Sequence, residues 1–194
     1  MNIHLFHKPL ALLADDELME RVSSMDDDGA YGELYRRHAR RLMGFFFRQT
    51  GKDEALAADL VQDAFLRIWT SRNKFSSTGF STWLFTISFN LLKNHFRHTE
   101  HRKQYEMTVS KQQDIVADAR IIEQIDSRAF DLALGRELDR LSPEGRLLFS
   151  LRFEEELTVR QIAEVMALPE GTVKSRLHAL TQTLKQKLNP KSRS

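Results

Sequence analysis

The sequence predicts an all-α protein with two small helical domains joined by a flexible linker, the second of which contains a helix-turn-helix. Three observations support this fold class. Glycine and proline are scarce, at 8 and 4 of 194 residues, which favours helices over turn-rich β structure. Apolar residues recur at helical spacing in two separate parts of the chain. The segment between those parts is polar and holds too few apolar side chains to bury a core of its own.

The composition is that of a globular protein, with 41% hydrophobic and 29% charged residues. The absence of cysteine excludes disulfides and thiolate metal sites, and it fits a reducing cytoplasm. No apolar run approaches the roughly 20 residues of a membrane span. The short run at 9–14 lacks the length and flanking charge of a signal peptide. We therefore expect a cytoplasmic protein that does not insert into a membrane.

The first domain is expected over residues 12–98. Asp15 or Asp16 can cap a short first helix, because aspartate is a favoured N-cap residue. A longer helix is predicted over about 28–49, with Gly51 as a suitable stop. These signals place two helices at the start of the domain.

The clearest helical pattern comes next, and its apolar stripe comprises Leu56, Leu60, Val61, Ala64, Phe65, Ile68 and Trp69. Residues 76–79 interrupt the pattern and are predicted to form a loop. Ser81 can then cap another helix that extends to about His98. The first domain is therefore expected to end with a helix.

Residues 99–128 are expected to form the linker, because their low hydrophobicity cannot offset the entropy cost of ordering them. The second domain is expected over 129–188. Within it, Ser142 followed by Pro143 is a strong helix start. The buried side of that helix is predicted to comprise Leu147, Leu148, Leu151 and Phe153.

Residues 158–178 have the layout of a helix-turn-helix. Thr158 and Gln161 fit a capping box, and the small Ala163 lets two helices cross closely. A turn at 167–169 leads to a final helix from about Glu170. The exposed groups suited to a DNA major groove are Thr172, Lys174, Ser175, Arg176 and His178 of the final helix, together with Arg160 of the preceding helix. From spacing alone, an ordinary helical hairpin with a polar outer face remains the alternative.

Positive charge gathers in two segments, residues 93–103 and the C-terminal end from Lys174 onward, although the formal net charge is only +2. Two separate basic patches suggest two contacts with one polyanion. Solvated helix surface explains the same charges equally well, so charge alone leaves both readings open.

The residues themselves carry a resemblance to a known family. The string from Leu168 to Leu177, LPEGTVKSRL, closely resembles the recognition-helix motif of extracytoplasmic-function sigma factors of bacterial RNA polymerase, as does the preceding string LTxxQIA from Leu157. Upstream, residues 59–69 (DLVQDAFLRIW) look like the family's helix that binds core polymerase. Residues 80–84 (FSTWL), with Ile87 and 90–91, look like its downstream-promoter segment. Ordered matches of this kind cover most of the chain.

The resemblance implies an alternative sigma factor that binds core RNA polymerase and directs promoter-specific transcription initiation. It implies a binding protein without cofactor or bound metal, and not an enzyme. Core polymerase would contact the exposed residues Asp59, Gln62, Asp63 and Arg67. A melted downstream element would contact Ser76, Ser77, Thr78, Asn90, Lys93, Asn94 and Arg97, and the helix-turn-helix would bind a double-stranded upstream element. An anti-sigma protein is a further partner that the family implies.

Some positions depart from the family's pattern, namely Thr86, Phe89, Asn94 and Ala179, and they prevent the naming of a promoter sequence. Two other functions remain as alternatives. An ordinary helix-turn-helix regulator would leave the polar face of residues 59–69 without a purpose. A sigma-like decoy that only sequesters an anti-sigma protein would not need the cations of the final helix. The spacing of His95, His98 and His101 allows a metal site on one helix face, although a basic surface near DNA is the preferred interpretation.

Overall fold

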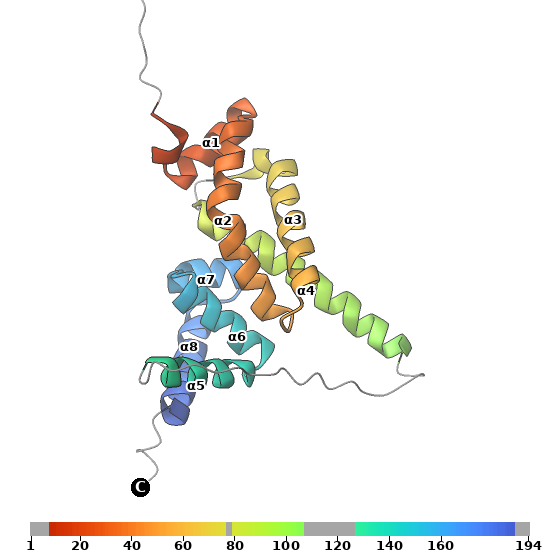
Figure 1. The fold of residues 1–194 in the computed structure, drawn as a ribbon, viewed down its shortest axis with the longest axis vertical. Coiled ribbons are helices and arrows are strands. Elements are labelled where there is room, and N and C mark those ends of the chain that lie inside the picture. The colour runs from red at the N-terminus through yellow and green to blue at the C-terminus, as the bar shows by residue number, and fades with distance from the viewer. Residues whose placement is uncertain (1–7, 77–78, 107–126, 189–194) are drawn as a thin grey trace, which may run out of the picture. The chain divides into compact units, whose positions relative to one another are not determined.

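The computed structural model describes residues 8–76, 79–106 and 127–188. These ranges contain helices, turns and no strand (Figure 1), which confirms the all-α prediction. The chain forms two compact units. Among the described residues, the first, N-terminal unit comprises 8–93, and the second comprises 94–106 and 127–188 apart from 164–167, which group with the first. Two helical domains were therefore correctly expected, while their boundaries stay a prediction.

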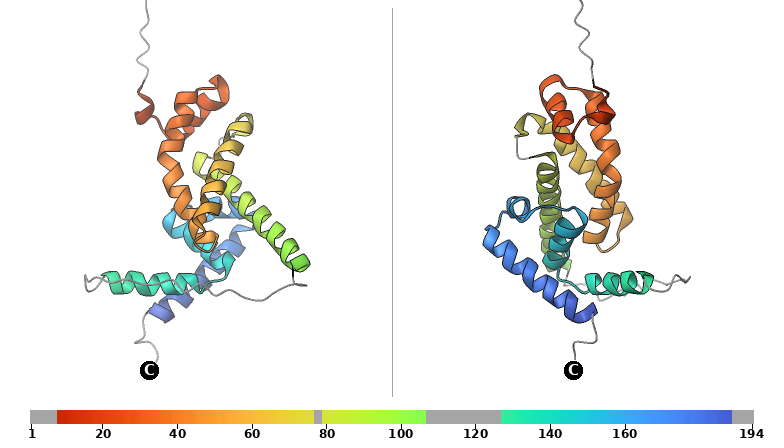
Figure 2. Two further views of the ribbon diagram at one scale, coloured as in Figure 1. Left: turned by 45° about the vertical axis from the view of Figure 1, so that its right-hand side comes forward. Right: turned by 90° about the vertical axis from the view of Figure 1, so that its left-hand side faces the viewer.

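In the N-terminal unit, four helices enclose an apolar core. Their bounds, with two short 3-10 turns, are η1 Leu10–Leu12, α1 Asp15–Met25, α2 Asp28–Gln49, α3 Glu54–Thr70, η2 Arg72–Lys74 and α4 Phe80–Glu106. Helices α2 and α3 run side by side, as the views in Figures 1 and 2 show. Phe45 of α2 and Phe85 of α4 are almost fully buried, and their ring centroids lie 5.2 Å apart. Aromatic packing thus joins α4 to α2.

The bounds of α2 match the expected helix over 28–49, because local signals specify both of its ends. Asp27 caps the helix, and its Oδ1 accepts the Ala30 N–H at 3.0 Å. After the last turn, Gly51 adopts a φ of +71°, a left-handed conformation that costs glycine little. Helix α3 begins in the same way, since Asp53 Oδ1 accepts the Leu56 N–H at 3.0 Å.

The prediction that Asp15 or Asp16 caps the first helix is wrong. Ala14 is the N-cap residue, and its N–H donates to Glu17 Oε2 at 2.7 Å. Both aspartates lie in the first turn of α1, where negative charge is favoured by the helix dipole. Their carboxylates bond to other elements, which local spacing could not indicate.

The expected start and end of α4 also differ from the structure. Ser81 does not cap the helix, because α4 begins one residue earlier and Gly79 O accepts the Trp83 N–H at 3.2 Å. The N–H of Phe80 donates to Asp16 Oδ1 instead. At its other end α4 continues past His98 to Glu106, so the first residues of the expected linker are helical.

The second unit contains the helix-turn-helix. Its elements are α5 Ser127–Asp139, α6 Pro143–Phe149, the π-helical turn η3 Ser150–Glu154, α7 Val159–Met166 and α8 Glu170–Leu188. The predicted caps are confirmed: Ser142 Oγ accepts the Gly145 N–H at 3.1 Å. Thr158 and Gln161 form a reciprocal pair of hydrogen bonds: the Thr158 N–H donates to Gln161 Oε1 at 2.9 Å, and the Gln161 N–H donates to Thr158 Oγ1 at 3.3 Å. The start of α8 at Glu170 also agrees with the prediction.

Phe153 is not on the buried side of α6, and its prediction is wrong: 49% of the residue is exposed. The expectation assumed a regular α-helix through this region. In the structure, η3 succeeds α6, and the Glu155 N–H bonds to Ser150 O across five residues. A π turn adds a residue to the hydrogen-bonded ring and rotates the later residues about the helix axis, so the apolar register is lost at Phe153. Leu147, Leu148 and Leu151 precede that shift and are buried as predicted.

Candidate functional site

The exposed face of α3 carries all four residues expected to contact core polymerase. They are Asp59, Gln62, Asp63 and Arg67, and offsets of three, four and eight residues from the first place them along one side of the helix. The opposite side, including Leu60, Ala64 and Ile68, is buried against the core. Within the described ranges, none of the four side chains has a hydrogen bond or ion pair. The face is therefore open to a partner from outside the unit.

Leu66 lies in the middle of this face and is 59% exposed. Sequence reasoning missed it, because Leu66 was included neither in the predicted apolar stripe nor among the polar groups chosen for the opposite face. Its position three residues after Asp63 and four after Gln62 was the available signal, since that spacing shares a helix face. A single exposed leucine is ordinary on a protein surface. An apolar side chain surrounded by polar groups is nevertheless the usual make-up of the centre of a protein interface.

The residues expected at a downstream element lie on two segments. Ser76 is exposed in the loop after η2, whereas Ser77 and Thr78 lie outside the described residues. Asn90, Lys93, Asn94 and Arg97 are exposed and succeed one another along one face of α4. In the described part of the chain these four side chains have no partner. The resulting stripe offers two cations and two amides.

Sequence reasoning also missed Arg72, which lies in η2 at the start of the same loop. Its guanidinium carbon lies 4.6 Å from the ring centroid of Trp69, and Nη1 donates to the Trp69 carbonyl at 2.9 Å. Its Nε lies 2.5 Å from Asp26 Oδ1 at the end of α1. Three contacts thus hold one basic side chain in place. The two with Trp69 are local, whereas Asp26 is 46 positions away in the sequence, and no local pattern points to it.

The groups of α7 and α8 expected to contact an upstream element differ in their exposure and in the bonds that they already make within the chain. Lys174, Ser175 and His178 are exposed, as is Arg160 on α7, while Thr172 is half-buried. Lys174 Nζ lies 4.0 Å from Glu170 Oε2, a solvent-exposed pair of the kind that contributes little stability. The hydroxyl of Ser175 donates to the Thr172 carbonyl. This end of α8 therefore presents polar groups that a nucleic acid could engage.

Arg176 is half-buried and paired with the carboxylate of Glu144 on α6. The sequence prediction treated it as a free cation of the recognition helix. A phosphate or a base that binds Arg176 would have to replace Glu144. Because both partners are partly exposed, that exchange is inexpensive.

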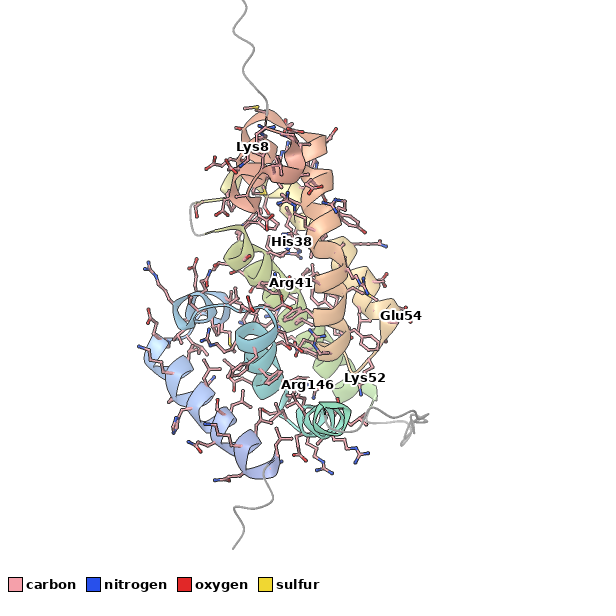
Figure 3. The ribbon with its side chains drawn as sticks, turned by 60° about the vertical axis from the view of Figure 1, so that its left-hand side comes forward. Lys8, His38, Arg41, Lys52, Glu54 and Arg146 are labelled. Atoms are coloured by element: carbon pink, nitrogen blue, oxygen red, sulfur yellow. The ribbon has the colours of Figure 1, made fainter. Side chains whose placement is uncertain are left out.

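A polar network fixes α1 to α2. Asp15 accepts from Arg37 Nη1 at 2.8 Å and from His38 Nε2 at 2.7 Å. His38, labelled in Figure 3, is buried, and its hydrogen bond is the largest cause that lowers the pKa of the Asp15 carboxyl. Arg37 also donates to the carbonyls of Leu10, Ala11 and Leu13. Hydrogen bonds from Arg36 and Arg37 lower the pKa of Glu33 from 4.5 to about 2.

No helix in the described ranges has the length and apolar character of a membrane-spanning segment. The described side chains also form no cluster of three or more candidate metal ligands. Of the spaced histidines, His95 is described and half-buried, whereas the side chains of His98 and His101 lie outside the described residues. The structure therefore adds nothing to the metal alternative.

Comparison with known proteins gives consistent matches. The family model for sigma-70 region 2 matches residues 34–102, and the model for sigma-70 region 4 matches residues 131–180. The ECF RNA polymerase sigma factor SigL of Mycobacterium tuberculosis is 30% identical over 154 residues, which cover 78% of this chain and 85% of that protein. BldN of Streptomyces coelicolor, also named as an ECF sigma factor, is 29% identical over 87% of this chain, and the match spans 63% of BldN.

Among solved structures, the sigma factor RpoE of Bartonella quintana, in complex with the anti-sigma factor NepR, matches with a TM-score of 0.63. The match covers 81% of this chain and 96% of that one at 23% sequence identity, so it supports the fold alone.

Proposed function

This chain belongs to the ECF sigma factors of bacterial RNA polymerase, and on that premise we propose which of its surfaces carry the function. The exposed face of α3 binds core polymerase. The stripe on α4, with the loop before it, binds the melted downstream element. The exposed groups of α7 and α8 bind the double-stranded upstream element. The protein acts in the cytoplasm, without cofactor or catalysis, and an anti-sigma protein is a further partner.

The observation that supports this assignment most strongly is the α3 face. Four polar side chains surround the exposed Leu66, and none of the four has a partner within the described chain. A protein interface of this make-up pairs an apolar anchor with satisfied polar groups at its rim. An ordinary DNA-binding regulator has no use for such a face. Core polymerase is the partner that the family provides.

The α4 stripe suits a single strand. Lys93 and Arg97 can neutralise phosphates, while Asn90 and Asn94 can hydrogen-bond to base edges or sugars. No nucleotide hydrolysis is required, because binding the unpaired strand shifts the melting equilibrium by mass action. The end of α8 suits a duplex, since the first turns of a recognition helix contact the major groove.

Co-migration with bacterial core RNA polymerase on a sizing column tests the first assignment, followed by transcription from a promoter library. Stable binding and transcription from a small promoter subset are expected. Binding to DNA without binding to core polymerase would identify an ordinary helix-turn-helix regulator. Tight binding to an anti-sigma protein with no transcription from any promoter would identify a decoy.

Matched variants separate the surfaces. Gln62→Ala with Asp63→Ala should weaken core binding and leave the isolated protein's upstream DNA binding unchanged. Glu54→Ala is the control, because Glu54 is exposed in the first turn of α3 and its helical spacing from Asp59 places it off the proposed face. Unchanged core affinity in the double variant, relative to this control, would remove α3 from the proposal.

Lys174→Ala should weaken upstream binding and leave core affinity unchanged. It should also lower the slope of log K against log salt by about 1, as the loss of one phosphate contact does. Lys185→Ala, which removes an exposed cation from the far end of the same helix, should do neither. A loss of core binding in Lys174→Ala would count against the assignment.

A further inference from the structure

We propose that α1 fixes the positions of both described ends of the loop between α3 and α4, and that Asp16 and Asp26 are the positioning residues that do so. The inference rests on the proposed function, in which this loop reads the downstream promoter element. It assigns a role in promoter readout to a helix that touches neither DNA nor polymerase in that proposal.

The first attachment is at the end of the loop, where α4 begins. Gly79 precedes the helix with a φ of +88° and has no side chain that could accept the first free N–H groups. Asp16 supplies the missing acceptor from 64 positions away in the sequence: the Phe80 N–H donates to its Oδ1 at 2.5 Å. A carboxylate is also the favoured group at the positive end of the helix dipole. Asp16 therefore acts as an N-cap provided by another helix.

The second attachment is at the start of the loop. Asp26 ends α1 in a left-handed conformation, with φ of 52°, and its Oδ1 lies 2.5 Å from Arg72 Nε. An isolated pair of this kind would contribute little, because the Asp26 side chain is 65% exposed. Arg72, however, is already held over the Trp69 ring and bonded to the Trp69 carbonyl. Asp26 thus adds a further contact to a side chain whose conformational freedom is already restricted by Trp69.

The two attachments lie at opposite ends of one rigid element. Helix α1 has 11 residues, a length of about 16 Å at 1.5 Å per residue. Its inner face is anchored by the fully buried Leu18, Met19 and Val22, and its first turn by the bonds of Asp15 to Arg37 and His38. Because α1 cannot shift without breaking these contacts, it sets the distance between the ends of the loop. Fixing Arg72 and Phe80 holds the described residues on either side of 77–78 in one arrangement, which favours one mode of base recognition.

The test measures how well the assembled holoenzyme discriminates between bases. Fork-junction DNA carries the downstream element obtained from the promoter library, either intact or with one base substituted in the single strand. The ratio of the two affinities is the readout, measured with core affinity and the thermal midpoint of the free protein. A purely structural defect would lower core affinity and the midpoint but would leave the ratio unchanged.

The variants are Asp16→Ala, Asp16→Asn and Asp26→Ala, with Glu20→Ala as the control. Glu20 is an exposed carboxylate of the same helix whose side chain has no partner in the described chain. Asp16→Ala should reduce the discrimination ratio by up to about fivefold, the factor that corresponds to one helix cap when the whole loss falls on the complex with the intact element. Asp16→Asn should restore most of it, because the amide oxygen can still accept the Phe80 N–H. Asp26→Ala should reduce the ratio less, and Glu20→Ala should not change it.

The outcomes separate this proposal from the function on which it rests. Wild-type protein that neither binds core polymerase nor discriminates between the bases would refute the proposed function itself. If the wild-type protein discriminates and both alanine variants have the same discrimination ratio as Glu20→Ala, the positioning role of α1 is refuted. If Asp16→Asn loses discrimination as fully as Asp16→Ala, negative charge and not the hydrogen bond is responsible, and the positioning role is refuted. Should Asp16→Ala fail to fold, Asp26→Ala and Asp16→Asn decide the matter.

Discussion

Replacing Asp15 by alanine should destabilise the N-terminal unit by about 2–3 kcal/mol, which is large for a residue in the first turn of a short helix. The reason is the partner left behind. Only 7% of the His38 side chain is exposed, and its Nε2 donates to Asp15 Oδ2 at 2.7 Å. Its other ring nitrogen already has no partner in the described chain. The substitution therefore leaves a buried polar ring without any hydrogen bond, which is the costly case.

Arg37 contributes less to this estimate. It retains its bond to Glu33 Oε1 at 2.7 Å and its bonds to the carbonyls of Leu10, Ala11 and Leu13. A partly exposed guanidinium with these partners loses little when one carboxylate is removed. Most of the expected loss therefore comes from His38.

Urea denaturation monitored by tryptophan fluorescence measures this loss directly. The sequence contains two tryptophans, Trp69 and Trp83, and both belong to the N-terminal unit, so the signal reports on that unit. Glu20→Ala is the matched control, since it removes an exposed carboxylate from the same helix. An Asp15→Ala variant within about 0.5 kcal/mol of this control, the range of ordinary surface substitutions, would refute the role assigned to the network.

The same structure supports three further predictions. Because the pKa values of Glu33 and Asp15 are lowered in the folded state, both carboxylates stabilise the fold above the ordinary carboxyl pKa, and the free energy of unfolding should fall as the pH drops from about 4.5 towards 2. Glu33→Gln should flatten this pH dependence, and an unchanged dependence in that variant would contradict the prediction. Gly79→Ala should cost about 1 kcal/mol, because an added Cβ meets no neighbour and only the positive φ is strained; tryptophan fluorescence checks this, and a much larger loss would indicate a clash. Ser142→Ala should remove the cap of α6 and cost about 1 kcal/mol, visible in far-ultraviolet circular dichroism but absent from tryptophan fluorescence.

Much of the candidate site was predictable from the sequence because it depends on local spacing. The polar face of α3 results from helical periodicity, and all four of its predicted residues are exposed as expected. The caps at Asp27, Ser142 and Thr158 bond to backbone within three residues, so residue identity and position specify them. The helix-turn-helix was recognisable for the same reason, since its two helices and turn are adjacent in the chain.

Only the tertiary structure decided which distant groups meet. The cap of α4 is Asp16 of α1, Arg72 bonds to Asp26, and Arg176 bonds to Glu144. Each of these pairs depends on how separate helices pack, and no local pattern specifies it. The exposure of Phe153 arose likewise from a π turn that altered the helical register. The sequence by itself thus determined the helices and the polar faces they present, because both result from interactions within a few residues. The packing of the helices determined how the loop ends are held and which cations have no ion-pair partner, because those depend on residues far away in the chain.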